Sequence, residues 1–237
     1  MSDKSPIIVA IDTPDVDRAK RILQETSPYV GCFKIGLEFF LAQGISGVDA
    51  LRNHVPGIDL FLDLKLHDIP NTVAGAARTL ARLEPRFLTV HASGGGAMVA
   101  AARDALPTTN ITAVTVLTSL DQEELIRLGL SVPIPAWTTS LAANAIENGA
   151  KSLVSSPHEV ASLRANFGSS ITLITPGVRP VEQSESSADD QKRVMTPIAA
   201  LRAGANFLVI GRPITAAKEP GAAAAKILQE ISSIDLH

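Results

Sequence analysis

Short apolar runs alternate with longer amphipathic stretches along almost the whole chain. The apolar runs have the length and the β-branched content of buried strands in a parallel sheet. We expect strands at Ile7–Ile11, Cys32–Ile35, Ile58–Leu64, Phe87–His91, Ile111–Leu117, Ser152–Ser155, Thr172–Thr175 and Phe207–Ile210. The stretches between them predict helices that include Val16–Glu25, Thr72–Leu83, Ala97–Ala105, Thr139–Asn148, Pro157–Ala165 and Ala222–Ile231. Asp15 and Ser156 are the expected helix caps, and Pro157 suits a first helical turn.

Eight strand-then-helix units without a break in composition predict an α/β fold, a single (β/α)8 TIM barrel over residues 1–237. A doubly wound open sheet is the alternative, because periodicity does not show whether a sheet closes. Two segments interrupt the pattern. DQEELIRLGL follows strand five, with a second helix from about Trp137, and the polar segment 181–195 follows strand seven. A long polar loop at that position favours a phosphate-gripping lid at about 179–195.

Composition narrows the class of function more than the fold. The 237 residues are 46% hydrophobic and 19% charged, which is typical of a globular protein with a substantial core. The net charge of −3 gives no basic surface for nucleic acid. We expect no signal peptide and no membrane span, and therefore a cytoplasmic protein. Cys32 is the only cysteine, so no intramolecular disulfide forms, and its apolar neighbours predict a buried thiol.

Charged residues stand at the carboxyl ends of the first three strands, where barrel enzymes place their active sites. In DLKLHDIPNT (63–72), Asp63 and Lys65 are two positions apart and should point the same way from the strand end, with Asp68 beyond them. Asp12 follows strand one, and Lys34 lies in strand two. An ordinary ion pair in solvent is the alternative. The repeated alternation of carboxylate and ammonium favours an active site, because crowded charges cost stability unless chemistry requires them.

The later strand ends predict a second kind of site. Gly211 and Arg212 follow strand eight, at a position where barrel enzymes often bind phosphate. Glycine permits close approach of the backbone, and arginine offers a bidentate fork to the phosphate oxygens. Arg179 and Gln191, in the expected lid, are placed to close over the same group, and Thr118 follows strand five.

Several common sites are absent. The sequence has no G-x-S-x-G elbow, no Walker A run and no G-x-G-x-x-G motif. The histidines, including His91 at the end of strand four, show no metal-ligand spacing. His67 next to Asp68 is a metal candidate by residue type, but a solvent or structural role is favoured. We therefore expect neither a metal nor a cofactor.

Motifs along essentially the whole chain resemble the orotidine 5′-phosphate decarboxylase family in its short bacterial form. They occur in the order IIVAID, FKIG, DLKLHDIPNT, VTVLTSL, TPGVRP, DDQKRVMTP and VIGRPIT. The resemblance implies a cofactor-independent carboxy-lyase that converts orotidine 5′-monophosphate (OMP) to UMP, the last step of de novo UMP synthesis. It also implies a homodimer with active sites shared across the interface, and no nucleic-acid or membrane partner.

The same resemblance implies a role for each matching residue. Lys65 would protonate C6 of the pyrimidine after CO₂ leaves, with Asp63 beside the departing carboxylate. Lys34 and Asp12 would hold the ribose hydroxyls and complete the charged array. The other implied contacts are to the partner subunit's site (Asp68 as a catalytic group, Ile69, Thr72), to the pyrimidine (Thr118) and to the 5′-phosphate (Arg179, Gln191, Gly211, Arg212).

Two alternatives stay open at this point. Metal-dependent sugar-phosphate decarboxylases and hexulose-phosphate synthases of the same superfamily share the Asp-x-Lys-x-x-Asp spacing, but they hold an enediolate on a divalent metal. The HDIPNT continuation and the position of Lys34 favour the nucleotide enzyme. A catalytically inactive phosphate-binding barrel is the second alternative, and the complete charged array argues against it.

Overall fold

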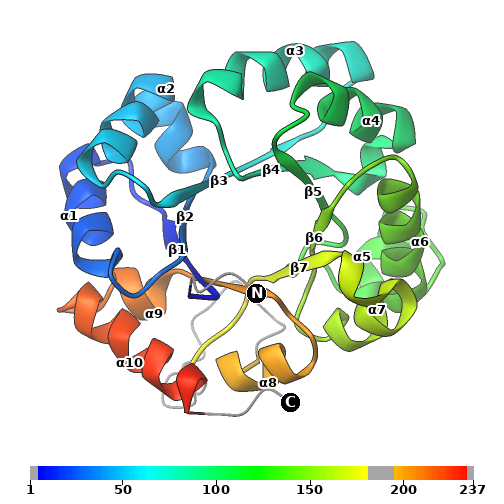
Figure 1. The fold of residues 1–237 in the computed structure, drawn as a ribbon. Helices are drawn as coiled ribbons and strands as arrows, with labels where there is room; N and C mark the ends of the chain where they lie inside the picture. The colour runs from blue at the N-terminus through cyan, green and yellow to red at the C-terminus, as the bar shows by residue number, and fades with distance from the viewer. Residues whose placement is uncertain (1–4, 181–194, 234–237) are drawn as a thin grey trace.

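The computed structural model describes residues 5–180 and 195–233, which form a closed parallel barrel with helices outside it (Figure 1). Each strand pairs with the next, and the last pairs with the first, so the predicted barrel is confirmed and the open sheet was the wrong alternative. The strands are β1 Ile7–Ile11, β2 Cys32–Ile35, β3 Asp59–Leu66, β4 Phe87–His91, β5 Asn110–Val114, β6 Ser152–Val154, β7 Thr172–Thr175 and β8 Phe207–Ile210.

The helices lie outside the ring of strands, as Figure 1 shows. They are α1 Val16–Thr26, α2 Leu37–His54, α3 Pro70–Leu80, α4 Gly96–Ala105, α5 Gln122–Arg127, α6 Ile134–Glu147, α7 Val160–Phe167, α8 Pro197–Arg202, α9 Arg212–Thr215 and α10 Pro220–Ser232, with 3₁₀ turns at Ala81–Leu83, Ala92–Gly94 and Gly168–Ser170. The predicted cap at Asp15 is confirmed, because its carboxylate accepts the N–H groups of Asp17 and Arg18. No helix in the described ranges is long and apolar enough to cross a membrane.

The start of α7 differs from the prediction. The helix begins at Val160 rather than Pro157, so the expected cap at Ser156 and the expected first-turn proline were wrong. The Ser156 hydroxyl accepts the N–H of His158 at 3.3 Å, and the Ser156 carbonyl accepts the N–H of Glu159. The Ser156 hydroxyl therefore closes a separate short turn, and the helical hydrogen bonds begin only at Glu159, whose carbonyl accepts the N–H of Leu163.

Most other elements also depart from the predicted bounds by a few residues; β3 runs to Leu66 rather than Leu64, and α3 covers Pro70–Leu80 rather than Thr72–Leu83. β5 ends at Val114 and does not reach Leu117. α6 begins at Ile134, before the expected start near Trp137. α2 was not among the predicted helices, and Gly44 lies inside it with φ 62°, where the helix is kinked and its apolar periodicity is interrupted.

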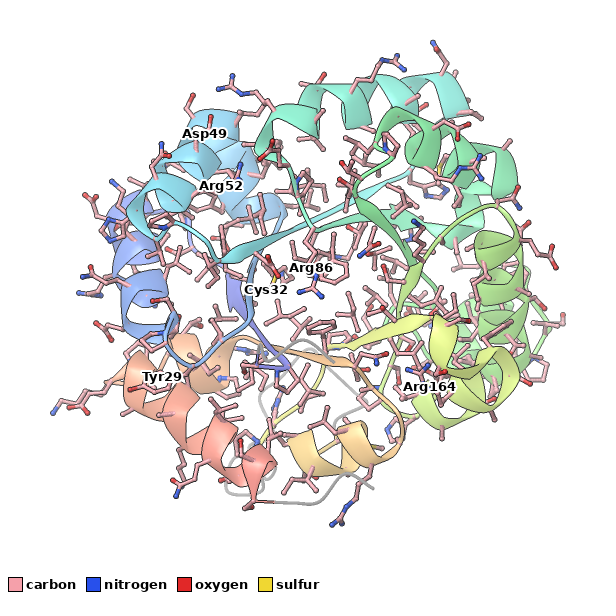
Figure 2. The ribbon with its side chains drawn as sticks, viewed as in Figure 1. Tyr29, Cys32, Asp49, Arg52, Arg86 and Arg164 are labelled. Carbon is pink, nitrogen blue, oxygen red and sulfur yellow. The ribbon has the colours of Figure 1, made fainter. Side chains whose placement is uncertain are left out.

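Two hydrophobic cores hold the barrel together. The larger lies between the strands and the helices, and the smaller fills the barrel interior with Ile8, Ala10, Cys32, Phe61, Phe87, Ile174 and Val209. Successive residues of a strand face opposite sides, so β1 contributes alternately to both cores. Cys32 is completely buried, which confirms the predicted core thiol, and Figure 2 shows it within the ring of strands.

Arg86 occupies the N-terminal end of the barrel interior. It immediately precedes β4, and Figure 2 shows it inside the ring of strands. Its guanidinium carbon lies 5.0 Å from the ring centroids of both Phe87 and Phe207, and Nη1 lies 2.6 Å from Asp59 Oδ2. This end of the barrel is therefore filled by a paired and stacked arginine.

Candidate active site

A cavity of about 600 Å³ opens at the C-terminal ends of the strands. Its volume suits a small-molecule ligand of nucleotide size. The structure brings most of the sequence-predicted site residues into its lining, namely Asp12, Lys34, Asp63, Lys65, Thr118, Arg179, Gly211 and Arg212. Gln191 lies outside the described residues, so its role stays a prediction.

Four charged side chains form a continuous series of ion pairs in this cavity. Lys34 Nζ lies 3.3 Å from Asp12 Oδ1 and 3.3 Å from Asp63 Oδ2, and Lys65 Nζ lies 2.8 Å from Asp63 Oδ1. The side chains of Lys34 and Asp63 are only 10% and 13% exposed, whereas that of Asp12 is 52% exposed. We call Asp12, Lys34, Asp63 and Lys65 the charged array; its two carboxylates and two ammonium groups balance.

The array holds its two central groups in their charged forms. Burial by itself would lower the pKa of Lys34, but the attraction of Asp63 and Asp12 outweighs it, so the pKa is raised. Burial would also raise the pKa of Asp63, but the attraction of Lys34 and Lys65 outweighs it, so that pKa is lowered. At neutral pH, therefore, a buried ammonium and a buried carboxylate face the cavity.

The end of β3 departs from a regular strand where it carries Asp63 and Lys65. Leu62 pairs with Leu88 of β4, but the next pair is Leu66 with Val90, so the register shifts between them. Lys65 has φ 49°, a left-handed conformation that residues other than glycine seldom adopt. The two side chains do meet, as predicted, but the shift and the left-handed turn contribute to the contact, and regular alternation alone does not explain it.

Gly36 lies directly against the array, at the end of the FKIG motif. A Cβ atom at this position would lie 3.1 Å from Asp12 Oδ1 and 3.2 Å from Lys34 Nζ. Both distances are shorter than an ordinary van der Waals contact, so any side chain here would press on the ion pair. The close approach of the backbone accounts for glycine at this position.

Sequence reasoning did not identify the apolar side of the cavity. Apolar residues of five strands line this side, namely Ala10, Phe61, Val114, Val154 and Val209. The signal for these residues was present in the two-residue strand period, but it reads as ordinary core until the open end of the barrel is known. Apolar walls keep water away from the ions and so strengthen their electrostatic effect.

Ser155 was also missed as a site residue. It follows β6 and lines the cavity, and its side-chain oxygen is buried without a hydrogen-bond partner among the described residues. A buried hydroxyl without a partner is costly, so a polar ligand group at this place would be stabilising.

Asp68, Ile69 and Thr72 are not among the residues that line the cavity. All three are exposed on the loop that leads into α3 and on its first turn, and Ile69 is 66% exposed. The Asp68 carboxylate accepts the N–H of Ile69 at 2.7 Å. The roles of these three residues in an active site therefore stay predictions.

His67, which follows β3, and His91, the last residue of β4, pack against each other beside the array. The rings of His67 and His91 have centroids 5.2 Å apart. The pKa of His91 is lowered, first by burial and then by repulsion from His67 and Lys65, which outweighs the attraction of Asp63. Among the described residues, no three His, Cys, Asp or Glu side chains gather in a way that would hold a metal ion.

The two ends of the expected lid meet at the rim of the cavity. Val178 pairs with Met195 in an isolated parallel bridge. The Arg179 N–H donates to the Met195 carbonyl at 3.0 Å, and the Met195 N–H donates to the Gly177 carbonyl at 3.2 Å. Arg179 is thus fixed at the rim, whereas the predicted lid interior, 181–194, lies outside the described residues.

Comparison with known proteins agrees with this geometry. Residues 5–227 match the family model described as "Orotidine 5'-phosphate decarboxylase / HUMPS family". A protein named orotidine 5′-phosphate decarboxylase from Thermobifida fusca is 54% identical over 96% of both chains. One of the same name from Moorella thermoacetica is 47% identical over 99% of this chain and 95% of its own. A crystal structure of orotidine 5′-phosphate decarboxylase from Lactobacillus acidophilus superposes with a TM-score of 0.83 at 35% identity, covering 97% of this chain and 99% of that chain.

The matched range, residues 5–227, spans all eight strands and the segment that carries the charged array and both arginines of the predicted phosphate site. The chain therefore belongs to the orotidine 5′-phosphate decarboxylase / HUMPS family.

Proposed function

We propose that this chain decarboxylates OMP to UMP, the last step of de novo UMP synthesis, without a cofactor and with Lys65 as the general acid. The observation that supports it most is the buried charged array in a cavity that Arg179 and Arg212 also line. Membership of a family whose relatives are named for this reaction supports the substrate. We also propose a cytoplasmic location, which rests on the proposed role in nucleotide synthesis.

The chemistry explains why such an array is useful. Loss of CO₂ from the pyrimidine leaves a pair of electrons on C6, a ring carbon with no adjacent group to accept them. Electrostatic stabilisation by a fixed ammonium in a pocket with apolar walls lowers the energy of that carbanion. Lys65 Nζ, held 2.8 Å from Asp63, is such a group, and it then gives its proton to C6. The bond to CO₂ breaks, and a bond from C6 to hydrogen replaces it.

The rest of the cavity positions the substrate. Arg179 and Arg212 provide cations for the 5′-phosphate, and Gly211 leaves room at the start of α9. Asp12 and Lys34 face the ribose, and Thr118 faces the pyrimidine. Binding energy from a phosphate remote from C6 can be used to hold the reacting ring against Lys65.

A metal-dependent sugar-phosphate reaction is the alternative that the family description keeps open. In the present geometry Lys34 lies within 3.3 Å of carboxylate oxygens of both Asp12 and Asp63. A divalent cation would need these same oxygens as ligands, and the ammonium already occupies the space between them. The buried lysine therefore favours the nucleotide reaction.

We further propose that the enzyme is a homodimer that completes each site with residues of both subunits. Asp68, Ile69 and Thr72 belong to the most specific motif of the chain, yet they lie outside their own cavity. Ile69 is a large apolar side chain in solvent, and Leu37 and Leu41 at the start of α2 are also exposed. An interface that covers these side chains and carries Asp68 to the partner's cavity accounts for both observations.

The decisive experiment is the loss of OMP absorbance with wild-type protein, Lys65→Ala and the exposed-lysine control Lys151→Ala. We expect wild-type and Lys151→Ala to turn over OMP equally with and without a chelator. Lys65→Ala should keep less than a few per cent of that rate, on the order of the loss of a main general acid, while still binding UMP. Loss of activity in chelator would support the metal-dependent alternative, and retained activity in Lys65→Ala would exclude Lys65 as the acid.

Shared sites are tested by mixing two inactive variants, Lys65→Ala and Asp68→Ala, under conditions in which subunits exchange. If Asp68 acts across the interface, one site of each mixed dimer contains both wild-type residues, so activity should return to about a quarter of wild type at equal mixing. No recovery, with exchange demonstrated by differently tagged subunits, would place Asp68 in its own subunit's site.

A further inference from the structure

The place where β3 and β4 lose register is bridged by one side chain, that of Thr89. Three residues of β3 lie between Leu62 and Leu66, whereas Thr89 alone lies between their partners Leu88 and Val90. The backbone ladder therefore has no regular rung opposite Thr89 on this side. On its other side Thr89 pairs regularly with Thr112 of β5, so its own position is fixed by the sheet.

The Thr89 hydroxyl contacts both members of the array that β3 supplies. Its Oγ1 accepts the backbone N–H of Lys65 at 2.8 Å and lies 3.2 Å from Asp63 Oδ1, with the Leu62 carbonyl farther away at 3.5 Å. A hydroxyl has one proton to donate and can accept at the same time, so it can accept from Lys65 and donate to the Asp63 carboxylate. Thr89 is completely buried, so solvent water does not compete for these hydrogen bonds.

These contacts act where the chain is least regular. Lys65 has the left-handed φ of 49°, and such a conformation persists only when its surroundings determine it. The bond from Thr89 fixes the N–H of that residue, and the bond to Asp63 fixes the carboxylate that lies 2.8 Å from Lys65 Nζ. The backbone and the side-chain partner of Lys65 are thus tied to one atom.

We propose that Thr89 is a positioning residue for the reaction: its hydroxyl replaces the missing β3–β4 rung and holds Lys65 and Asp63 in their working geometry. The part of this proposal that concerns the reaction rests on the proposed decarboxylase function. The part that concerns geometry does not, so the two can be tested separately.

The test compares Thr89→Val, which keeps the shape but removes the hydroxyl, with Thr89→Ser, which keeps the hydroxyl. Thr112→Val is the matched control, because Thr112 is an equally buried threonine on the neighbouring strand whose hydroxyl bonds to Asn110 and Ser152 rather than to the array. We expect Thr89→Val to lower kcat for OMP by about 10- to 100-fold, the order of loss for a misplaced catalytic group, with KM changed less than about threefold. Thr89→Ser should recover most of kcat, and Thr112→Val should stay near wild type.

A second measurement needs no substrate. Hydrogen exchange of the Lys65 backbone amide, followed by NMR, should become at least about tenfold faster in Thr89→Val but not in Thr89→Ser, because only the serine retains the acceptor. Should the valine variant not fold, Thr89→Ala takes its place in the comparison with serine. If the wild-type protein did not turn over OMP but the variants showed the expected exchange pattern, the decarboxylase function would be rejected and the geometric role of Thr89 would stand.

Three results would overturn the positioning role itself. They are unchanged Lys65 exchange in Thr89→Val, a serine variant no better than valine, or an equal loss of kcat in Thr112→Val. The last of these would show that any buried hydroxyl in this part of the sheet matters only for packing.

Discussion

The central ion pair of the charged array, Lys34 with Asp63, should show a large coupling energy in the stability of the ligand-free protein. At the observed 3.3 Å, Coulomb's law with an effective dielectric constant of about 20 gives about 5 kcal/mol. Lys65 also attracts Asp63, and Asp12 also attracts Lys34, so removing one partner leaves the other only partly uncompensated. We therefore expect a coupling of roughly 2–3 kcal/mol, below the Coulomb value because these competing charges remain.

The coupling is measured by urea unfolding of wild type, Lys34→Met, Asp63→Asn and the double variant at pH 7 and one fixed protein concentration. Each single variant should lose about 2–3 kcal/mol, and the double variant should lose little more than either. The exposed pair Lys20–Asp17, 3.8 Å apart on α1, gives the matched control, and its cycle should show less than about 0.5 kcal/mol.

The pH dependence of this coupling has a definite sign. The pKa of Asp63 is lowered in the folded protein from its ordinary 3.8, so the folded state binds its proton less readily than the unfolded state. The stability contributed by Asp63 is therefore complete above the unfolded pKa and is lost as the pH falls through the folded pKa.

If the losses of the two single variants, Lys34→Met and Asp63→Asn, simply added at pH 7 to within about 0.5 kcal/mol, the reasoning on the ion pair would be refuted.

Three further predictions concern other parts of the barrel. Arg212→Ala should lower kcat/KM for OMP by about 30- to 1000-fold but leave turnover of the phosphate-free nucleoside orotidine almost unchanged; equal losses would mean that Arg212 supports the barrel. Arg86→Leu should lower the free energy of unfolding by about 2 kcal/mol, because the Arg86–Asp59 ion pair is lost, with kcat within about twofold of wild type; unchanged stability in urea would contradict this. The pKa of His91 is lowered from 6.5, chiefly by burial, so its contribution to stability is complete above pH 6.5 and is lost as the pH falls below that value. His91→Gln should flatten this part of the urea-derived stability profile, and identical slopes would count against the assignment.

The barrel could be predicted from sequence because its signal is repeated. Short apolar runs alternate with longer helical stretches, and eight such units make closure the favoured architecture. The failed boundaries have local causes. Before α7, the Ser156 hydroxyl closes a separate turn, so the helix starts later than the serine suggests. In α2, Gly44 interrupts the helical period, so the sequence does not show one continuous helix.

The candidate site could be predicted only in part. Charged residues at strand ends can be identified from sequence because a parallel barrel gathers those ends at one rim, and the structure does place Asp12, Lys34 and Asp63 together. The register shift in β3 could not be predicted, because it depends on how β3 meets β4 rather than on either sequence alone. Thr89 looks like Thr112 in the sequence, since both are β-branched residues inside strands.

The two ends of the barrel use buried charge in different ways. At the N-terminal end, Arg86 has Asp59 as an ionic partner, and its guanidinium lies 5.0 Å from the centroids of two aromatic rings that also contact each other. At the C-terminal end, the Lys34 ammonium pairs with the carboxylates of both Asp12 and Asp63. Lys65 has a left-handed backbone conformation, which residues other than glycine seldom adopt. Such features persist only where rigid surroundings fix them. The regular, well-paired strands below supply that rigidity, so the charged array can remain in place for substrate without rearranging when charge develops.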